Sequence, residues 1–521
     1  RINGLDGPYT QILLDSRPIF SALSGVYGIE QIPASMIERV EVMRGGGSAL
    51  FGSSAIAGTI NIITKEPMRN SGMLSHTITG IGDGDVFDNS TALNASLVTD
   101  DQRAGLYIFG QNRHRSAYDH DGDGYSEIPK LHGQTIGFRS FLKTTTYSKL
   151  TFEYHHMEEF RRGGDLLNRP PHEANVAEQT EHSINGGGLK FDYFSPNENH
   201  RFNVFASAQH INRDSYYGPG DRDPLDAYGN TTDLNWMAGS QYVYSFGKCI
   251  FMPSDLTAGI EFNQDKLEDN MWGYNRTVDQ KVNIGSAFLQ NEWKNDHWGF
   301  LIGGRLDKHN LIDHVIFSPR ANLRYNPTEN INLRFSYSSG FRAPQAFDED
   351  LHVENVGGNV AMVELADNLK EERSQSLSAS ADIYHRFGAF QVNFLVEGFY
   401  TKLSDVFALT DGEVVDGILT RTRHNASGAQ VLGLTLEGKM AYLNKIQVQA
   451  GVTLQQSHYS KPHIWNKEAP AVKKMMRTPN TYGYFTATYT PIKPLSIALS
   501  GTYTGSMLVP HEPVPGFLEN P

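Results

Sequence analysis

The feature of this chain that most restricts its fold is a polarity pattern that repeats from residue 68 to the end. Segments of about ten residues alternate apolar and polar side chains and are separated by turns. Clear examples are residues 202–208, 332–337, 391–399, 446–452 and 482–489. Because successive side chains of a strand point to opposite faces, the pattern predicts many strands, each with one apolar and one polar face.

Two kinds of connection separate these segments. Some are short and carry Asn, Pro or Gly, as in 325–330, whereas others are long and polar, as in 161–179. Short turns at one rim and long loops at the other are typical of outer-membrane barrels. No run approaches about 18 apolar residues, which argues against a helical membrane span. A soluble β-sandwich array or a propeller is the alternative, but no repeat of fixed period supports it.

Composition agrees with an all-β transmembrane antiparallel barrel and excludes other classes. The 50 Gly, 24 Tyr and 28 Phe fit turn glycines and the aromatic girdles of barrel rims. The net charge of −13 argues against a nucleic-acid partner, which would require a basic patch. Cys249 is the only cysteine, which excludes a disulfide framework and a CxxC metal site.

Residues 1–67 follow a different pattern and predict a small α+β domain. We expect strands at 11–15, 40–42 and 58–64 and a short helix at 33–37. The predicted domains are therefore 1–67 and a barrel at 68–521. The chain begins within a strand-like pattern, from which we expect that a mature N-terminal part is missing.

The run from Ile37 to Lys65 resembles the plug signature of TonB-dependent outer-membrane receptors. Residues 7–15 look like an earlier plug strand of that family, 340–344 (Gly-Phe-Arg-Ala-Pro) are similar to its barrel box, and 424–438 resemble a late barrel strand. The resemblance thus covers nearly the whole chain. The signature residues are Arg39, Glu41, Arg44, Gly45, Gly46, Gly47, Gly52 and Gly58.

The resemblance implies a barrel of the 22-stranded class with the N-terminal α+β plug inside its lumen. The TonB box and the terminal aromatic strand of the family are not seen, so we expect somewhat fewer strands here. The implied location is the outer membrane of a Gram-negative bacterium, with membrane lipid and the TonB–ExbB–ExbD complex as partners. The sequence does not decide whether a surface-exposed lipoprotein caps the barrel as a further partner.

The plug signature carries charges that would be costly in an ordinary core. We expect Arg39, Glu41 and Arg44 to pair with charges of the barrel wall, which would keep the plug in place until it is remodelled. The consecutive glycines at 45–47 predict a tight backbone turn in a crowded lumen.

An acidic loop begins at Asp119 and has the spacing of the first half of an EF-hand loop. Its twelfth position is Lys130 instead of Glu, so another group must complete the shell. The alternative is an acidic surface turn. We favour a Ca²⁺ ion that orders an extracellular loop, with no catalytic cofactor. The candidate ligands are Asp119, Asp121, Asp123, Tyr125 and Glu127.

His352 follows the 340–344 box by a short interval, and in haem receptors of this family a His between two boxes is an axial-ligand candidate. The second box is reduced here to 368–370, and a lone loop His is usually solvated. Aromatic side chains that could face a flat macrocycle are Tyr216, Tyr217, Trp272 and Tyr274, with an interfacial girdle as the alternative. His155 and His156 should point to opposite faces of a strand and cannot share a metal.

The predicted function is active import of a scarce nutrient too large for a porin. The sequence as a whole most resembles cobalamin receptors and their haem-receptor relatives, such as those of Bacteroidetes. Cobalamin ranks slightly above haem because the second haem box is degraded, and a ferric siderophore ranks third. A surface adhesin or docking protein would need no plug. No nucleophile-elbow or zincin spacing is present, so we do not expect an enzyme.

Overall fold

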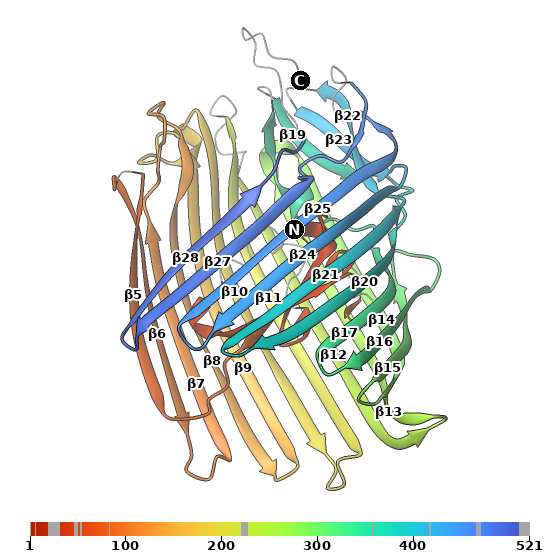
Figure 1. Cartoon of the computed structure of the whole chain (residues 1–521). Coiled ribbons are helices and arrows are strands. Elements are labelled where there is room, and N and C mark those ends of the chain that lie inside the picture. Colours follow the sequence, from red (N-terminus) through yellow and green to blue (C-terminus); the bar gives the residue numbers. More distant parts are fainter. Residues whose placement is uncertain are drawn as a thin grey trace.

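A large antiparallel sheet curved into a barrel and a small plug sheet make up the fold in the computed structural model (Figure 1). The structure describes residues 2–5, 7–18, 32–45, 51–52, 55–82, 84–219, 228–356, 359–415, 418–464 and 470–509. In this part of the chain no helix is long and apolar enough to cross a membrane.

Twenty strands form the large sheet within the described residues, and most of them pair with the next strand along the chain. The predicted all-β barrel with somewhat fewer than 22 strands is therefore confirmed. The strands are β5 (Ser71–Ile81), β6 (Val86–Val98), β7 (Ala104–Arg115), β8 (Ser126–Thr145), β9 (Ser148–Gly164), β10 (Val176–Phe194), β11 (His200–Pro219), β12 (Tyr228–Cys249), β13 (Met252–Met271), β14 (Arg276–Lys294), β15 (Trp298–His309), β16 (Ile316–Thr328), β17 (Ile331–Arg342), β20 (Glu372–Phe387), β21 (Phe390–Ser404), β24 (Ala429–Tyr442), β25 (Ile446–His463), β26 (Val472–Lys474), β27 (Thr481–Ile492) and β28 (Leu495–Thr504).

The alternation of side chains in these strands is inverted relative to that of a soluble protein. In β15, Ile302 and Leu306 are 62% and 49% exposed, whereas Arg305, Asp307 and His309 are at most 4% exposed. The apolar side chains thus face outward and the charged ones face the lumen. This arrangement suits a barrel whose outer surface contacts lipid.

The connections differ between the two rims as the sequence predicts. β8 ends at Thr145 and β9 begins at Ser148, whereas β17 ends at Arg342 and β20 begins only at Glu372. Several strands are longer than expected; β12 has 22 residues, about twice the length that a membrane requires.

Aromatic side chains gather near the short turns, where the outer surface would meet the membrane interface. The pairs are Trp298–Tyr325 with ring centroids 4.2 Å apart, Phe390–Tyr442 at 4.5 Å and Phe251–Trp293 at 5.6 Å.

The plug is a four-stranded sheet in the order β2-β1-β4-β3, and Figure 1 shows it in red inside the barrel. The strands are β1 (Thr10–Leu14), β2 (Arg17–Pro18), β3 (Ile37–Arg44) and β4 (Gly58–Thr64). The expected helix is only a 3₁₀ turn, η4 (Ala34–Met36), and a second such turn, η1 (Gly7–Tyr9), precedes β1. Plug residues Leu14, Met36 and Ile62 pack against Tyr107 and Phe109 of β7, so plug and wall share an apolar core.

A second small sheet lies at the rim of the long loops. It has the order β18-β19-β23-β22 and comes from the two connections β17–β20 and β21–β24. Short helical elements also occur in connections at this rim. The bounds are β18 (Glu354–Val356), β19 (Asn359–Leu365), β22 (Phe407–Val415), β23 (Ile418–Asn425), α2 (Asp348–Leu351), η5 (Pro171–Glu173) and η6 (Trp272–Tyr274).

Candidate functional site

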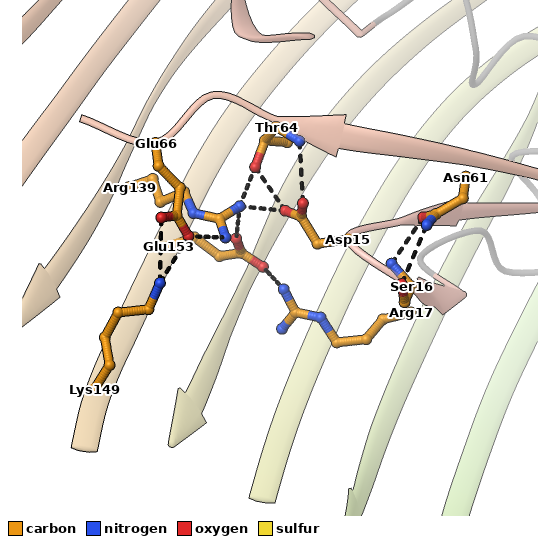
Figure 2. A network of polar contacts seen from close by, with 9 residues as sticks. All are labelled: Asp15, Ser16, Arg17, Asn61, Thr64, Glu66, Arg139, Lys149 and Glu153. Carbon is orange, nitrogen blue, oxygen red and sulfur yellow. Dashed lines mark hydrogen bonds and ion pairs between the residues drawn. The ribbon is translucent and has the colours of Figure 1, made fainter. Parts of the chain in front are cut away.

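A polar network joins the β1–β2 turn of the plug to strands β8 and β9 of the wall (Figure 2). The Asp15 carboxylate accepts hydrogen bonds from the Thr64 backbone N–H at 3.0 Å and from the Thr64 hydroxyl at 2.6 Å. Arg139 donates to both Asp15 and Thr64, and Arg17 of the plug donates to Glu153. The turn is therefore bonded to charged residues of the wall on one side and to Thr64 of the plug on the other.

Among the charged residues of the plug signature, Arg44 is the one that contacts the wall within the described part of the chain. Arg44 donates to Glu397 of β21 at 2.9 Å and to Glu437 of β24. Arg39 and Glu41 instead pair with each other at 2.8 Å and are about half exposed, so the expectation that they bind the wall is wrong. Side chains two apart on a strand lie on the same face, and this face of β3 points away from the wall charges.

The signature glycines have separate roles. Gly45 has φ +81° and Gly52 has φ +83°, a backbone region that favours glycine. At Gly58 a Cβ would lie 2.3 Å from the Met43 carbonyl oxygen, so the close pairing of β3 with β4 requires glycine there. Gly46 and Gly47 lie outside the described residues.

Tyr9 of the plug forms a buried junction with the wall and a long loop. Its hydroxyl donates to Glu372 at 2.9 Å, and the same carboxylate oxygen accepts from the Phe407 backbone N–H at 2.6 Å. Arg342 lies 3.7 Å from the other oxygen of Glu372 and 4.1 Å from the Phe347 ring centroid. Burial, with Glu372 next to it, holds the pKa of Tyr9 well above its ordinary value, so the phenol stays a donor.

Sequence reasoning missed Tyr9, Arg139, Glu153 and Glu372 as functional positions. Tyr9 and the neighbouring Arg342 did lie within recognised motifs, residues 7–15 and 340–344, but without an assigned role. The charged residues among them stand at inward positions of strands, where a charge that faces a packed lumen needs a partner, and this signal could have pointed to them.

A cavity of about 340 Å³ lies between the upper ends of β8–β11 and the loop that follows β17. His352 and Val353 line it from the loop side, and Glu127, Arg161 and Tyr217 line it from the wall. The half-buried His352 ring packs edge-on against Tyr217, with centroids 4.9 Å apart. The structure thus brings together His352 and Tyr217, two of the predicted ligand-binding residues.

The other predicted aromatic residues mostly do not present faces to a ligand. Tyr216, Tyr217 and Tyr274 are at most 3% exposed and pack with loop residues that include Met362. The Tyr274 hydroxyl donates to the Tyr217 carbonyl oxygen at 2.5 Å. Among the four, Trp272 is 61% exposed and offers an open ring, whereas the burial of Tyr216 and Tyr274 contradicts an aromatic platform there, and Tyr217 lines the cavity beside His352. The loop sheet covers Tyr216 and Tyr274.

The acidic loop brings four carboxylates together. One oxygen from each of Asp119, Asp121, Asp123 and Glu127 lies within 4.8 Å of the others. Asp119 also accepts from the Gly122 and Gly124 N–H groups at 2.7 and 2.9 Å, which folds the loop tightly. Such a set of oxygen donors suits a hard divalent cation, although hydrogen bonds within the loop also stabilise it.

His155 and His156 lie on opposite faces of β9, as expected. His155 is 7% exposed and lines the lumen, whereas His156 lies 3.0 Å from the Asn185 side-chain oxygen on the outer face.

Ion pairs neutralise arginines in the outer half of the lumen. Arg161 pairs with Glu159 at 2.7 Å, Arg276 with Asp269 at 2.8 Å and Arg421 with Asp411 at 3.0 Å. Arg423 pairs with Asp350 at 2.5 Å. These four arginines therefore each have a carboxylate partner within the part of the chain that the structure describes.

Comparison with known proteins decides the family. The model described as "TonB dependent receptor-like, beta-barrel" matches residues 71–517, and the "TonB-dependent Receptor Plug Domain" model matches residues 1–59. The chain belongs to the TonB-dependent receptors. These are β-barrel transport receptors of the outer membrane of Gram-negative bacteria, not enzymes.

Individual relatives of this TonB-dependent receptor are distant. The "Iron-regulated outer membrane virulence protein" of Vibrio cholerae is 26% identical over 383 residues, covering 69% of this chain and 54% of the relative. The "Vitamin B12 transporter BtuB" of Vibrio vulnificus is 23% identical over 360 residues, covering 67% and 54%. The chain spans about half the length of these curated relatives.

Solved structures agree on the fold. The siderophore receptor PirA from Acinetobacter baumannii superposes with a TM-score of 0.76 at 17% identity, covering 96% of this chain and 79% of that one. The relatives therefore bear out the predicted receptor family, and their named ligands differ from one another.

Proposed function

We propose that this receptor imports a large organometallic nutrient across the outer membrane and that a corrinoid such as cobalamin is its ligand. The observation that carries import is the plug itself, held in the lumen by ion pairs at two separate places, Arg17–Glu153 and Arg44–Glu397. A barrel that only displayed a surface for docking would need no such closure. Remodelling the plug would require the TonB–ExbB–ExbD complex, which transmits energy from the inner membrane.

Charge supports a corrinoid over a ferric siderophore. Several buried arginines around the outer lumen are paired with carboxylates, such as Arg276 with Asp269 and Arg423 with Asp350. An anionic chelate would have to break these buried pairs, and loss of one partner of such a pair costs about 3–5 kcal/mol. A corrinoid whose positive and negative charges offset each other would leave them intact.

The position of His352 supports a corrinoid over haem. Haem capture needs an accessible axial donor, normally His or Tyr. The His352 ring is half-buried and packs on Tyr217, so it lines a cavity wall and does not project from it. The cavity of about 340 Å³ is at the lower end for a small-molecule site and would receive one edge of a larger ligand.

A titration of the purified receptor in detergent with cyanocobalamin, haemin and ferric enterobactin tests this ranking. We expect saturable binding of cyanocobalamin. Tight haemin binding with a Soret shift that disappears in His352→Ala, and no cyanocobalamin binding, would establish the haem alternative instead. Uptake of the bound ligand by cells with and without TonB then separates import from surface binding.

We also propose that the acidic loop binds Ca²⁺ through Asp119, Asp121, Asp123 and Glu127, with the Tyr125 carbonyl as a further donor. Glu127 also lines the cavity next to His352. An ion at this place would therefore order one wall of the proposed ligand site.

A further inference from the structure

The plug is attached to the wall by one set of ion pairs at Arg44 and by another at Asp15 and Arg17. The two sets differ in the wall charges that would remain unpaired if each set opened. Removal of Arg44 would leave Glu397 and Glu437 facing the lumen without their common cation. Removal of Asp15 and Arg17 would leave Arg139 and Glu153, which already lie 3.6 Å apart. The wall charges on the β8–β9 side can thus neutralise each other, whereas those on the β21–β24 side cannot. Buried charges without partners are costly, so the β8–β9 side opens more easily.

Arg17 itself is incompletely bonded. Its side chain is 7% exposed and donates to Glu153 through Nη2, but its Nε and Nη1 have no hydrogen-bond partner among the described residues. The guanidinium is thus held to the wall by one charge-assisted hydrogen bond to a protein group.

The turn between β1 and β2 also favours release. Asp15 and Ser16 have φ of +48° and +67°, and neither is glycine. Such positions cost on the order of 1 kcal/mol each and persist only when surrounding contacts hold them. Here the contacts are Thr64 with Asp15, and the Ser16 N–H donating to the Asn61 side chain at 2.8 Å.

The order of strands places this hairpin at the edge of the plug sheet. The order is β2-β1-β4-β3, so within the described residues the β1–β2 hairpin joins the rest of the sheet through β4 alone, by the pairing of β1 with β4 and the bonds of the turn to Asn61 and Thr64. The hairpin can therefore separate while β3 and β4 stay paired and Arg44 stays bound to the wall.

Space is already present behind the hairpin. A polar cavity of about 170 Å³ lies between Arg17 and the wall residues Thr151 and Lys190. At Gly188 of β10 a Cβ would lie 2.4 Å from Nη1 of Arg17, so the guanidinium occupies a recess that exists only because this wall residue has no side chain. Withdrawal of Arg17 would join the recess to the cavity.

We propose that the imported molecule passes between the β1–β2 hairpin and the β8–β10 wall, and that Arg17 is the positioning residue that keeps this route closed. This inference rests on the proposed import function. It further specifies that the lumen opens on the β8–β10 side. β3 and its Arg44 remain in place on the opposite side during passage.

Cysteine labelling in living cells tests the route. In a Cys249→Ser background, Thr151→Cys reports the β9 wall beside the hairpin and Thr435→Cys reports the β24 wall beside Arg44. The two threonines are matched, because both are inward-facing strand residues and are 5% and 6% exposed. Cells given cyanocobalamin are treated with a maleimide reagent with and without the proton-motive force. We expect labelling of Thr151→Cys to rise about tenfold on energisation and that of Thr435→Cys to stay unchanged.

A rise at Thr435→Cys that equals or exceeds that at Thr151→Cys, or no rise at either position, would overturn the route. Adding Arg17→Gln to Thr151→Cys should raise its labelling even without energy, whereas Arg39→Gln, which removes only the exposed pair with Glu41, should not. Equal labelling in these two variants would contradict the role of Arg17. Cyanocobalamin uptake measured on the same cells separates failure of the route from failure of the proposed import.

Discussion

Replacing Tyr9 by Phe should loosen the first plug strand, because Tyr9 is the residue through which this segment contacts the wall carboxylate Glu372. The change deletes one hydrogen bond of 2.9 Å and leaves the ring in its apolar cluster. Glu372 is 0% exposed and keeps the Phe407 N–H and Arg342 as partners. The loss is therefore that of one hydrogen bond to a charged group, about 1.5–3 kcal/mol.

That free energy corresponds to about 10- to 150-fold faster local opening, since about 1.4 kcal/mol is a factor of ten. Amide hydrogen exchange of the purified receptor in detergent measures it. The expected increase is confined to residues 7–14 and to the loop around Phe407, which shares the carboxylate. We expect β3, anchored by Arg44 on another part of the wall, to exchange as before.

Tyr107→Phe is the matched control. Its hydroxyl donates to the Ser35 carbonyl oxygen at 2.7 Å, which is a neutral partner, so about 1 kcal/mol or less should be lost, and only near η4. Equal effects of the two substitutions, or unchanged exchange of residues 7–14 in Tyr9→Phe, would refute the assignment of Tyr9 as a charge-assisted anchor.

Three further outcomes are expected. Calorimetry with Ca²⁺ should show a weak site, in the millimolar range of extracellular modules, that Asp121→Asn removes; equal titrations would dismiss the site. His352→Ala should weaken cyanocobalamin binding by about fivefold or less, corresponding to one hydrogen bond of about 1 kcal/mol, and a total loss measured by fluorescence quenching would show a larger role. Arg44→Met leaves two wall carboxylates unpaired, so hydrogen exchange of β3 should quicken strongly; exchange no faster than in the wild type would show that this pair does not hold the plug.

The sequence alone determined the class of fold, because that information is local. Alternation with a period of two reports which face of each strand is apolar, and β15 shows it directly, with Ile302 and Leu306 facing outward and Arg305 facing inward. The plug strands and the acidic loop at Asp119 were likewise predictable, since turn residues and carboxylate spacing act within a few residues of each other.

Only the tertiary structure decided which of these residues meet. Arg44 reaches the wall and Arg39 does not, because the rotation of the plug in the lumen sets which face of β3 approaches the carboxylates. Arg139 contacts Asp15 across 124 positions of sequence, and no local pattern encodes that distance. From the sequence, Tyr216 and Tyr274 were expected to present their rings to a ligand. In the folded chain, two remote loops form a sheet that covers them. Side-chain periodicity specifies the face of a strand, but the partner on that face depends on long-range packing.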